Sequence, residues 1–463
     1  MTAAHPIGQA DRLGIDELAA KYGGRVPRYT SYPTAVQFTP AVGASAYGRW
    51  LEMLDPAAGP LSIYLHVPFC QSLCWYCGCH TSVVNAIGPI RDYAETLLAE
   101  IELVALRLPG RFRLGAVHFG GGTPNMLTPV DLARILDALA LHFDITPGAE
   151  IAAEIDPRVL TRAWLAAARS AGINRASLGV QDFDPAVQAA INREQPYELV
   201  ADVVALLRDT GIASLNFDLI YGLPRQSMES LATTIAQAVA LEPDRLSLFG
   251  YAHVPWLKPH QKLLPEADLP GPALRFMMQK EAAEGLEAAG YRRLGLDHFA
   301  KPKDDLAHAA GQGRMRRNFQ GYTTDEAPTL IGFGASAISR LPQGYAQNEP
   351  RVPNWRNHIS RGELPVARGV AVDADDRFRA EIIEHLMCDF RIDLAAACAR
   401  HGRDLRDLGA ELDALDTMRR DGLVDMHGSD LEVTRDGRDL VRSVCAVFDR
   451  YLDGGGTRHS QGI

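Results

Sequence analysis

Four cysteines lie within ten residues in "HVPFCQSLCWYCGCH" (66–80), and three more are scattered singly through the 463-residue chain. A disulfide is one explanation, but it suits an oxidising compartment, and the N-terminus lacks the basic start and apolar run of a secretory signal. A zinc site is a second explanation, although zinc ligands are usually spaced as two CxxC pairs about fifteen residues apart, and these cysteines are crowded together. The third is an iron–sulfur cluster, because closely spaced thiolates on one loop can hold several irons of one cubane.

The spacing Cys70-x3-Cys74-x2-Cys77 supplies three ligands, so one iron of a cubane stays open if Cys79 points elsewhere. An open iron can bind a small molecule through an amine and a carboxylate, and the amino-acid end of S-adenosylmethionine (SAM) carries both groups. The turn "GGGTP" (120–124) could then contribute to ligand binding, because glycines let the backbone approach a ligand closely. Tyr76 could pack on an adenine, although isolated aromatic residues more often belong to a core.

Apolar strand-like runs alternate with amphipathic helical patterns between residues 61 and 255. The six runs are "LSIYLHVPF" (61–69), "GAVHFGGG" (115–122), "EIAAEIDP" (150–157), "RASLGVQDF" (175–183), "LNFDLIYGLP" (215–224) and "RLSLFGYAHVP" (245–255). Six β-α units with buried parallel strands predict an α/β fold, a partial (β/α)6 barrel like an incomplete TIM barrel.

Polar or Gly-rich residues end all six predicted strands. In strand order they are Cys70, the "GGGTP" turn, Glu154 with Asp156, Gln181, Asp218 and the stretch from Tyr251 to His253. One buried polar group at a strand end is usually a paired structural group. A series of strands ending this way instead indicates an active site, because chemistry in such barrels takes place at the carboxyl ends of the strands.

Four parts divide the chain. Residues 1–60 form an N-terminal segment, and residues 61–340 form the barrel and an extension with short strands in "YRRLGLDHFA" (291–300) and "TLIGFGASAIS" (329–339). Residues 341–369 are rich in Pro, Gly and Asn, which predicts a linker. Residues 370–463 predict helices, then a hairpin and a final helix, a mostly α-helical domain resembling a winged helix.

Charge and composition exclude several classes of protein. The chain has a formal net charge of −10, and residues 370–463 contain 13 Arg, no Lys and 20 acidic residues, so the winged-helix-like domain is itself negative. That sign argues against nucleic-acid binding, which needs clustered cations. The sequence has no uninterrupted run of about 18 apolar residues, so we expect no membrane span. Seven cysteines, an odd number without paired spacing, predict the reducing cytoplasm. No helix carries a long apolar stripe beyond core needs, which predicts a monomer.

The cysteine triad with an aromatic residue before its third member resembles the radical SAM signature, and further stretches narrow the resemblance. These are "RYTSYPT" (28–34), "CGCH", "GGGTP", "EIDPR", "GVQDF", "NREQ", "NFDLIYGLP", "YAHVP", "DHFA", "RNFQGYTT" and "GFGASAIS". In this order, from about residue 21 to 452, they resemble the oxygen-independent coproporphyrinogen III oxidase (coproporphyrinogen dehydrogenase) family. The resemblance implies a partial barrel of the radical SAM type.

The resemblance also implies the cofactor residues. Cys70, Cys74 and Cys77 would hold a [4Fe–4S] cluster, with Cys79 as an additional cysteine that is not a ligand. Two SAM molecules would bind, one on the cluster and one beside it. Positions matching the family's first SAM site are Tyr64, Glu154, Ala252 and Ile338. Positions matching the second are Tyr76, Gly121, Gly122, Thr123, Gln181, Arg193 and Asp218.

The implied reaction is the oxidative decarboxylation of two propionates of coproporphyrinogen III to vinyls, which gives protoporphyrinogen IX. A 5′-deoxyadenosyl radical from SAM would take a hydrogen atom, so no side chain is assigned as a catalytic base, and an unnamed electron donor would be needed. The substrate has four carboxylates, so we expect cations in its site. The candidates for substrate binding are Arg25, Arg28, Arg316, Arg317 and Gln320.

A radical-SAM-like protein that binds haem and delivers it is the alternative. Such relatives typically lack the fourth cysteine of "CGC" and the segment "RYTSYPT", and both are present here. We expect "RYTSYPT" to fold over the open side of the barrel. No motif assigns a role to the C-terminal tail "GTRHSQGI" (456–463).

Overall fold

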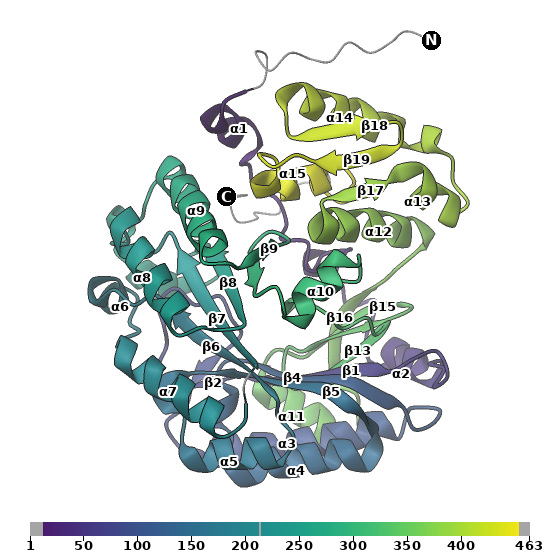
Figure 1. Ribbon diagram of the computed structural model, residues 1–463. Helices are drawn as coiled ribbons and strands as arrows, with labels where there is room; N and C mark the ends of the chain where they lie inside the picture. Colours follow the sequence, from purple (N-terminus) through teal and green to yellow (C-terminus); the bar gives the residue numbers. More distant parts are fainter. Residues whose placement is uncertain (1–12, 213, 453–463) are drawn as a thin grey trace.

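One 12-stranded sheet dominates the computed structural model, which describes residues 13–212 and 214–452 (Figure 1). The strand order is β16-β15-β14-β13-β1-β4-β5-β6-β7-β8-β10-β9. The parallel strands are β1 (Leu61–Val67), β4 (Arg113–Gly121), β5 (Asp144–Ile155), β6 (Arg175–Gln181), β7 (Ser214–Tyr221), β8 (Arg245–Gly250) and β13 (Thr329–Phe333). The antiparallel strands are β9 (Arg292–Leu294), β10 (His298–Ala300), β14 (Ile338–Leu341), β15 (Gly344–Asn348) and β16 (Val366–Ala371).

The six predicted strands pair in chain order as a parallel sheet, which confirms the partial barrel. The structure adds a seventh parallel strand, because β13 pairs with β1 and places Gly332 level with Tyr64. Short pairs outside the sheet are β2 (Phe69–Cys70) with β3 (Ser82–Val83), and β11 (Arg316–Asn318) with β12 (Gly321–Thr323).

Helices connect the parallel strands, and several lie together along the outer side of the sheet in Figure 1. They are α3 (Ile87–Ala105), α4 (Pro129–His142), α5 (Arg162–Ser170), α6 (Pro185–Ala190), α7 (Tyr197–Asp209) and α8 (Met228–Ala240). Helix α4 shows why they form: Thr128 caps its start by accepting from the amide of Asp131, and Pro129 occupies the first turn. Its buried residues repeat with helical spacing at Leu132, Ile135, Leu136 and Leu139.

The stretch 341–369 is not a linker. It contributes β15 and β16 to the main sheet and forms α11 (Val352–Ser360) between them. Its glycines serve close strand pairing: a Cβ on Gly344 would lie 2.0 Å from the carbonyl oxygen of Val370, and one on Gly369 would lie 2.1 Å from that of Tyr345. Gly-rich composition here marks close backbone approach within a sheet, which composition alone does not distinguish from a loop.

The C-terminal part forms a separate hydrophobic core. Its helices are α12 (Ala374–Asp389), α13 (Leu394–Arg400), α14 (Gly409–Asp421) and α15 (Val441–Ala446). The hairpin of β18 (Val424–His427) and β19 (Asp430–Val433) is present as predicted, and β17 (Arg391–Asp393) adds an unpredicted third strand. The tail 456–463 lies outside the described residues.

The N-terminal segment contacts both parts of the molecule. Helix α1 (Ile15–Tyr22) lies beside the C-terminal domain in Figure 1, and α2 (Ala44–Glu52) packs near β16. Between them, the buried side chains of Tyr29 and Tyr32 belong to the C-terminal core. The remaining helices are α9 (Pro272–Ala288) and α10 (Asp305–Gly311). Among the described helices, none is long and apolar enough to cross a membrane.

Candidate active site at the carboxyl ends of the strands

A cavity of about 710 Å³ lies at the carboxyl ends of the barrel strands. We call it the cysteine-loop cavity, because residues 70–79 form part of its wall. Of the residues predicted for cofactor or substrate, it is lined by Arg28, Cys70, Cys74, Tyr76, Cys77, Gly121, Gly122, Thr123, Glu154, Gln181, Arg193, Asp218, Ala252 and Gln320. Tyr64 and Ile338 do not line it, although Tyr64 donates to or accepts from His66 Nδ1 at 3.1 Å beside it.

The cysteine loop is held in place by the segment that follows β8. Gln261, which is buried, donates to the carbonyl oxygens of Tyr76 at 2.9 Å and Ala252 at 3.2 Å. Lys258 donates to the carbonyl oxygen of Cys79 at 2.8 Å. Sequence reasoning missed Gln261 and Lys258, because the oxygens of the cysteine loop to which they donate are 185 and 179 residues away in the chain.

The thiols fit a [4Fe–4S] cluster. Cys70, Cys74 and Cys77 all face the cysteine-loop cavity. Across residues 13–212 and 214–452, no three His, Cys, Asp or Glu side chains come together closely enough to hold a single metal ion. Closely spaced thiols that face one cavity suit a cubane, in which each thiolate binds a different iron. A hydrogen bond with Cys79, opposed by burial, lowers the pKa of the Cys77 thiol to about 7.

The three glycines at the end of β4 (Gly120 to Gly122) make room for protein atoms. A Cβ on Gly120 would lie 2.7 Å from Glu154 Oε1, and a Cβ on Gly121 would lie 2.6 Å from the ring of His66. At Gly122 the added atom would lie 2.7 Å from the carbonyl oxygen of Phe69, which precedes the first cysteine. The "GGGTP" turn therefore lets the cysteine loop and Glu154 pack directly against the end of β4.

Glu154 is fixed at the end of β5. It accepts from the amide of Gly121 at 3.0 Å, and its Oε1 lies 3.4 Å from His118 Nε2. Burial opposes ionisation, but the contacts with His118 and Gly121 outweigh it and lower the pKa of Glu154. The carboxylate is therefore charged at neutral pH and faces the cavity.

Arg193 is buried beside the cysteine loop. Its Nη1 lies 3.5 Å from Cys74 Sγ and 3.4 Å from Asp156 Oδ2, and its Nη2 donates to the carbonyl oxygen of Gly179 at 2.6 Å. A surface role, the common one for arginine, is excluded by this burial. The guanidinium places a fixed positive charge next to the thiols.

Gln181 and Asp218 complete the polar wall on β6 and β7. Gln181 has a positive φ of 69°, an unusual conformation for a residue other than glycine, at a register shift between β6 and β7. Asp218 accepts from Ser177 Oγ at 3.0 Å and from Asn216 Nδ2 at 2.9 Å. Burial and then the nearby Glu154 raise the pKa of Asp218.

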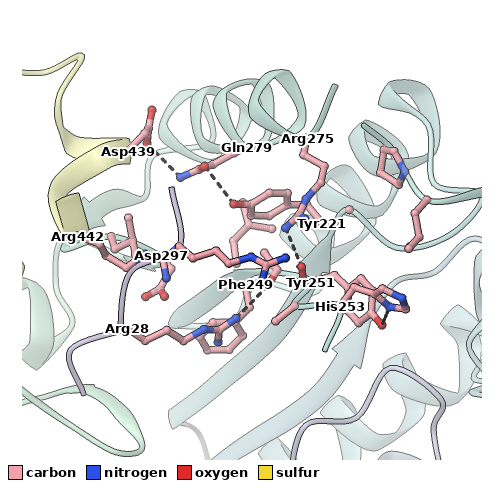
Figure 2. A pocket seen from close by; sticks show the side chains of 18 of the residues that line it. Arg28, Tyr221, Phe249, Tyr251, His253, Arg275, Gln279, Asp297, Asp439 and Arg442 are labelled. Carbon is pink, nitrogen blue, oxygen red and sulfur yellow. Dashed lines mark hydrogen bonds between the residues drawn. The ribbon is translucent and has the colours of Figure 1, made fainter. Parts of the chain in front are cut away.

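A second cavity, of about 320 Å³, adjoins the first and shares its wall from Phe249 to Ala252. We call it the arginine pocket (Figure 2). Arg25, Arg28 and Arg317 of the predicted substrate residues line it, together with Arg275 and Arg442, which sequence reasoning missed. Those two lie on helices without any motif around them.

Arg316 lies apart from both cavities. It is adjacent to Arg317 on β11, so the two side chains point to opposite faces of the strand. Arg316 lines a separate hollow with Glu326 and Arg340. The structure therefore does not bring Arg316 together with the other candidate substrate residues.

Comparison with known proteins identifies the family. Residues 64–238 match the Radical SAM superfamily, and residues 372–440 match the HemN C-terminal domain. The oxygen-independent coproporphyrinogen III oxidase of Bradyrhizobium diazoefficiens is 49% identical over 448 residues, 96% of this chain and 99% of that protein. The protein of that name from Escherichia coli is 39% identical over 436 residues, 94% of this chain and 95% of that protein.

A solved structure supports the same relationship. The coproporphyrinogen III oxidase HemN from Escherichia coli, described as a radical SAM enzyme, aligns with a TM-score of 0.88 at 38% identity, covering 92% of this chain and 98% of that one. Both the barrel and the C-terminal domain are matched at nearly full length. The chain therefore belongs to the oxygen-independent coproporphyrinogen III oxidase family of the radical SAM superfamily.

Proposed function

We propose that this chain converts two propionates of coproporphyrinogen III to vinyls without oxygen and so forms protoporphyrinogen IX. The observation that carries the proposal is the cysteine-loop cavity, which is lined by Cys70, Cys74, Cys77 and Cys79 and by polar residues at the ends of β5, β6 and β7. Family membership at 49% identity over nearly the whole chain supports it. Each propionate loses a β-hydrogen atom, then CO2 and one electron, which leaves the vinyl.

Cys70, Cys74 and Cys77 would hold a [4Fe–4S] cluster, as membership of the superfamily implies. When bound, the cluster and SAM supply the 5′-deoxyadenosyl radical that takes the hydrogen atom. The cysteine loop keeps its shape through the backbone contacts of Gln261 and Lys258. Reduction of the cluster requires an electron donor, and the electron released with CO2 requires an acceptor.

The polar groups around the loop suit two SAM molecules. The ionised Glu154 can accept hydrogen bonds from ribose hydroxyls or an ammonium group. Asp218 can do the same from β7, and Arg193 can pair with a carboxylate. Tyr76 lines the cavity inside the cysteine loop and offers a ring for an adenine. These roles follow the sequence positions of the family, and the placement of the side chains around one cavity supports them.

An anaerobic assay tests the proposal. The full chain is reconstituted with iron and sulfide, reduced with dithionite and supplied with SAM and coproporphyrinogen III. We expect protoporphyrinogen IX, with 5′-deoxyadenosine and methionine, and we expect all three to disappear in Cys74→Ser. Cys398→Ala, which changes a buried cysteine of the C-terminal core, is the matched control and should keep the cluster and the activity.

Two results would contradict the proposal. SAM cleavage with untouched coproporphyrinogen III would instead favour the haem-binding alternative. Full activity in Cys74→Ser would remove the cysteine loop from the cluster site.

A further inference from the structure

Four arginines from four separate parts of the chain meet in the arginine pocket. Arg28 comes from the N-terminal segment, Arg275 from α9, Arg317 from β11 and Arg442 from α15. Figure 2 shows Arg28 and Arg275 entering the same space from different elements. These guanidinium groups gather in one pocket of a chain whose formal net charge is −10.

The pocket holds more positive charge than its own carboxylates balance. With Arg25 it is lined by five arginines, against the carboxylates of Glu266, Asp297 and Asp439. Asp439 is already paired with Arg293, which does not line the pocket. Glu266 has an exposed side chain and lies 3.4 Å from His253. Asp297 is therefore the main counter-charge inside.

The hydrogen-bonding groups of the pocket arginines are not all paired with protein atoms. Among the described residues, Nε of Arg275 and Nε of Arg317 are buried and have no hydrogen-bond partner. The bonds that Arg28 and Arg275 do make are to backbone, to the carbonyl oxygens of Gly250 at 3.2 Å and Tyr251 at 2.7 Å. Those bonds aim the side chains without neutralising their charge.

The electrostatics of the pocket favour the binding of an anion. Burial, followed by repulsion from Arg28, lowers the pKa of Arg442 to about 10. Burial also lowers the pKa of Arg28 and of Arg275. Although burial opposes it, the hydrogen bond with His298 and the charges of Arg317 and Arg28 lower the pKa of Asp297 to about 2. An entering carboxylate would relieve the repulsion between these guanidinium groups.

We propose that the arginine pocket binds the two propionates that the reaction leaves intact. The inference rests on the proposed function and adds which carboxylates of the substrate lie there. The shared wall from Phe249 to Ala252 joins the pocket to the cysteine-loop cavity, so one tetrapyrrole can reach both. Two carboxylates would also reduce the excess of arginines over acidic residues in the lining.

The chemistry selects the unreactive propionates. Decarboxylation turns a carboxylate into neutral CO2, so arginines paired with that carboxylate would stabilise the starting state more than the transition state. A reacting propionate is therefore better placed away from them, in the neighbouring cavity. The propionates that keep their charge gain from charge-assisted bonds throughout the reaction.

Porphyrin binding tests the inference without requiring turnover. Fluorescence titration of the cluster-containing full chain would use coproporphyrin III, with four propionates, and mesoporphyrin IX, whose only two propionates are at the positions that the reaction leaves. We expect Arg275→Gln and Arg442→Gln each to lower the affinity for both porphyrins by about 10-fold or more. Arg275→Lys, which keeps the charge, should lose less porphyrin affinity than Arg275→Gln.

Arg340→Gln is the matched control. Arg340 Nη2 donates to a backbone oxygen, that of Ala327 at 2.6 Å, as Arg275 does, but it lines the separate hollow with Arg316. Weaker coproporphyrin III binding with unchanged mesoporphyrin IX binding would place the reacting propionates in the pocket and overturn the inference. Unchanged affinity for both porphyrins would show that no carboxylate binds there. Failure of the wild type to convert coproporphyrinogen III would refute the proposed function instead, whatever these affinities are.

Discussion

Single glycines decide whether the cysteine loop can sit against β4. Gly122 is the clearest case, because its missing Cβ would meet Thr81 Oγ1 at 2.6 Å and the backbone of Phe69 at 2.7 Å. Backbone cannot move aside as a flexible side chain can, so the clash would fall on the residue next to Cys70. Thr81 also lies 3.1 Å from Cys70 Sγ, so the same position bears on the first thiol.

Gly122→Ala should displace the cysteine loop and reduce cluster content. Overpacking of this kind costs about 1–3 kcal/mol, here concentrated on one loop. Iron and sulfide per chain, with the visible absorbance of the reconstituted protein, measure the effect. Gly409→Ala at the start of α14 is the control, since its added Cβ meets nothing within 4 Å. Equal cluster content in the two variants would refute this prediction.

A buried carboxyl joins α3, β15, α11 and the segment that follows β13. Glu100 on α3 accepts from the amide of Gly334 after β13 at 2.7 Å and from Asn348 of β15 at 2.7 Å. Oε2, the oxygen that accepts from Gly334, also accepts from Trp355 Nε1 on α11 at 3.2 Å. Through this one side chain, the stretch 341–369 is tied to the barrel, which explains why it is ordered structure.

Burial raises the pKa of Glu100 from 4.5 to about 8, although three hydrogen bonds oppose the shift. Between these values the folded chain holds a proton that the unfolded chain has released, so stability falls as pH rises from 4.5 to 8. Glu100→Gln mimics the protonated carboxyl and should flatten this dependence. In the wild type, the shifted pKa of Glu100 should lower the free energy of unfolding by at most about 5 kcal/mol between pH 5 and pH 8.5.

Urea unfolding at pH 5 and at pH 8.5 measures this change in the free energy of unfolding. Glu102→Gln, an exposed position on the same helix, should keep the slope of the wild type. A slope for Glu100→Gln equal to that of Glu102→Gln would mean that Glu100 is ionised in the folded chain throughout this range.

The two cavities draw their residues from different parts of the chain. The thiols and Glu154 belong to the barrel, whereas the arginine pocket needs the N-terminal segment and the C-terminal domain as well. Tyr29 connects these last two: it is buried in the C-terminal core, and its hydroxyl donates to Asp449 Oδ2 at 3.0 Å. It follows Arg28 directly, so its anchoring positions that arginine.

Tyr29→Ala should therefore affect the two sites unequally. We expect a loss of about 3–5 kcal/mol in stability, as for other large buried side chains, and weaker porphyrin binding with unchanged cluster content. Tyr291→Ala is the control, because Tyr291 is equally buried in the barrel core and donates to the carbonyl oxygen of Pro243. Equal porphyrin affinity in the two variants would show that the N-terminal anchor does not position the pocket.

Local patterns in the sequence determined the barrel and the cysteine loop. The thiols lie within ten residues, and each of the six strands is a short apolar run ended by a polar residue, so neighbours along the chain carry the signal. Glu154, Gln181 and Asp218 could be placed together because the carboxyl ends of parallel strands share one edge of the sheet.

Only the tertiary structure decided the arginine pocket and the course of residues 341–369. Arg275 and Arg442 are ordinary helix residues in sequence, and Arg28, Arg275, Arg317 and Arg442 become neighbours only when four distant elements pack together. Gly344 and Gly369 likewise look like loop residues until β15 and β16 pair. Contacts between residues far apart in the chain leave no periodic pattern, so packing of the whole molecule is required to reveal them.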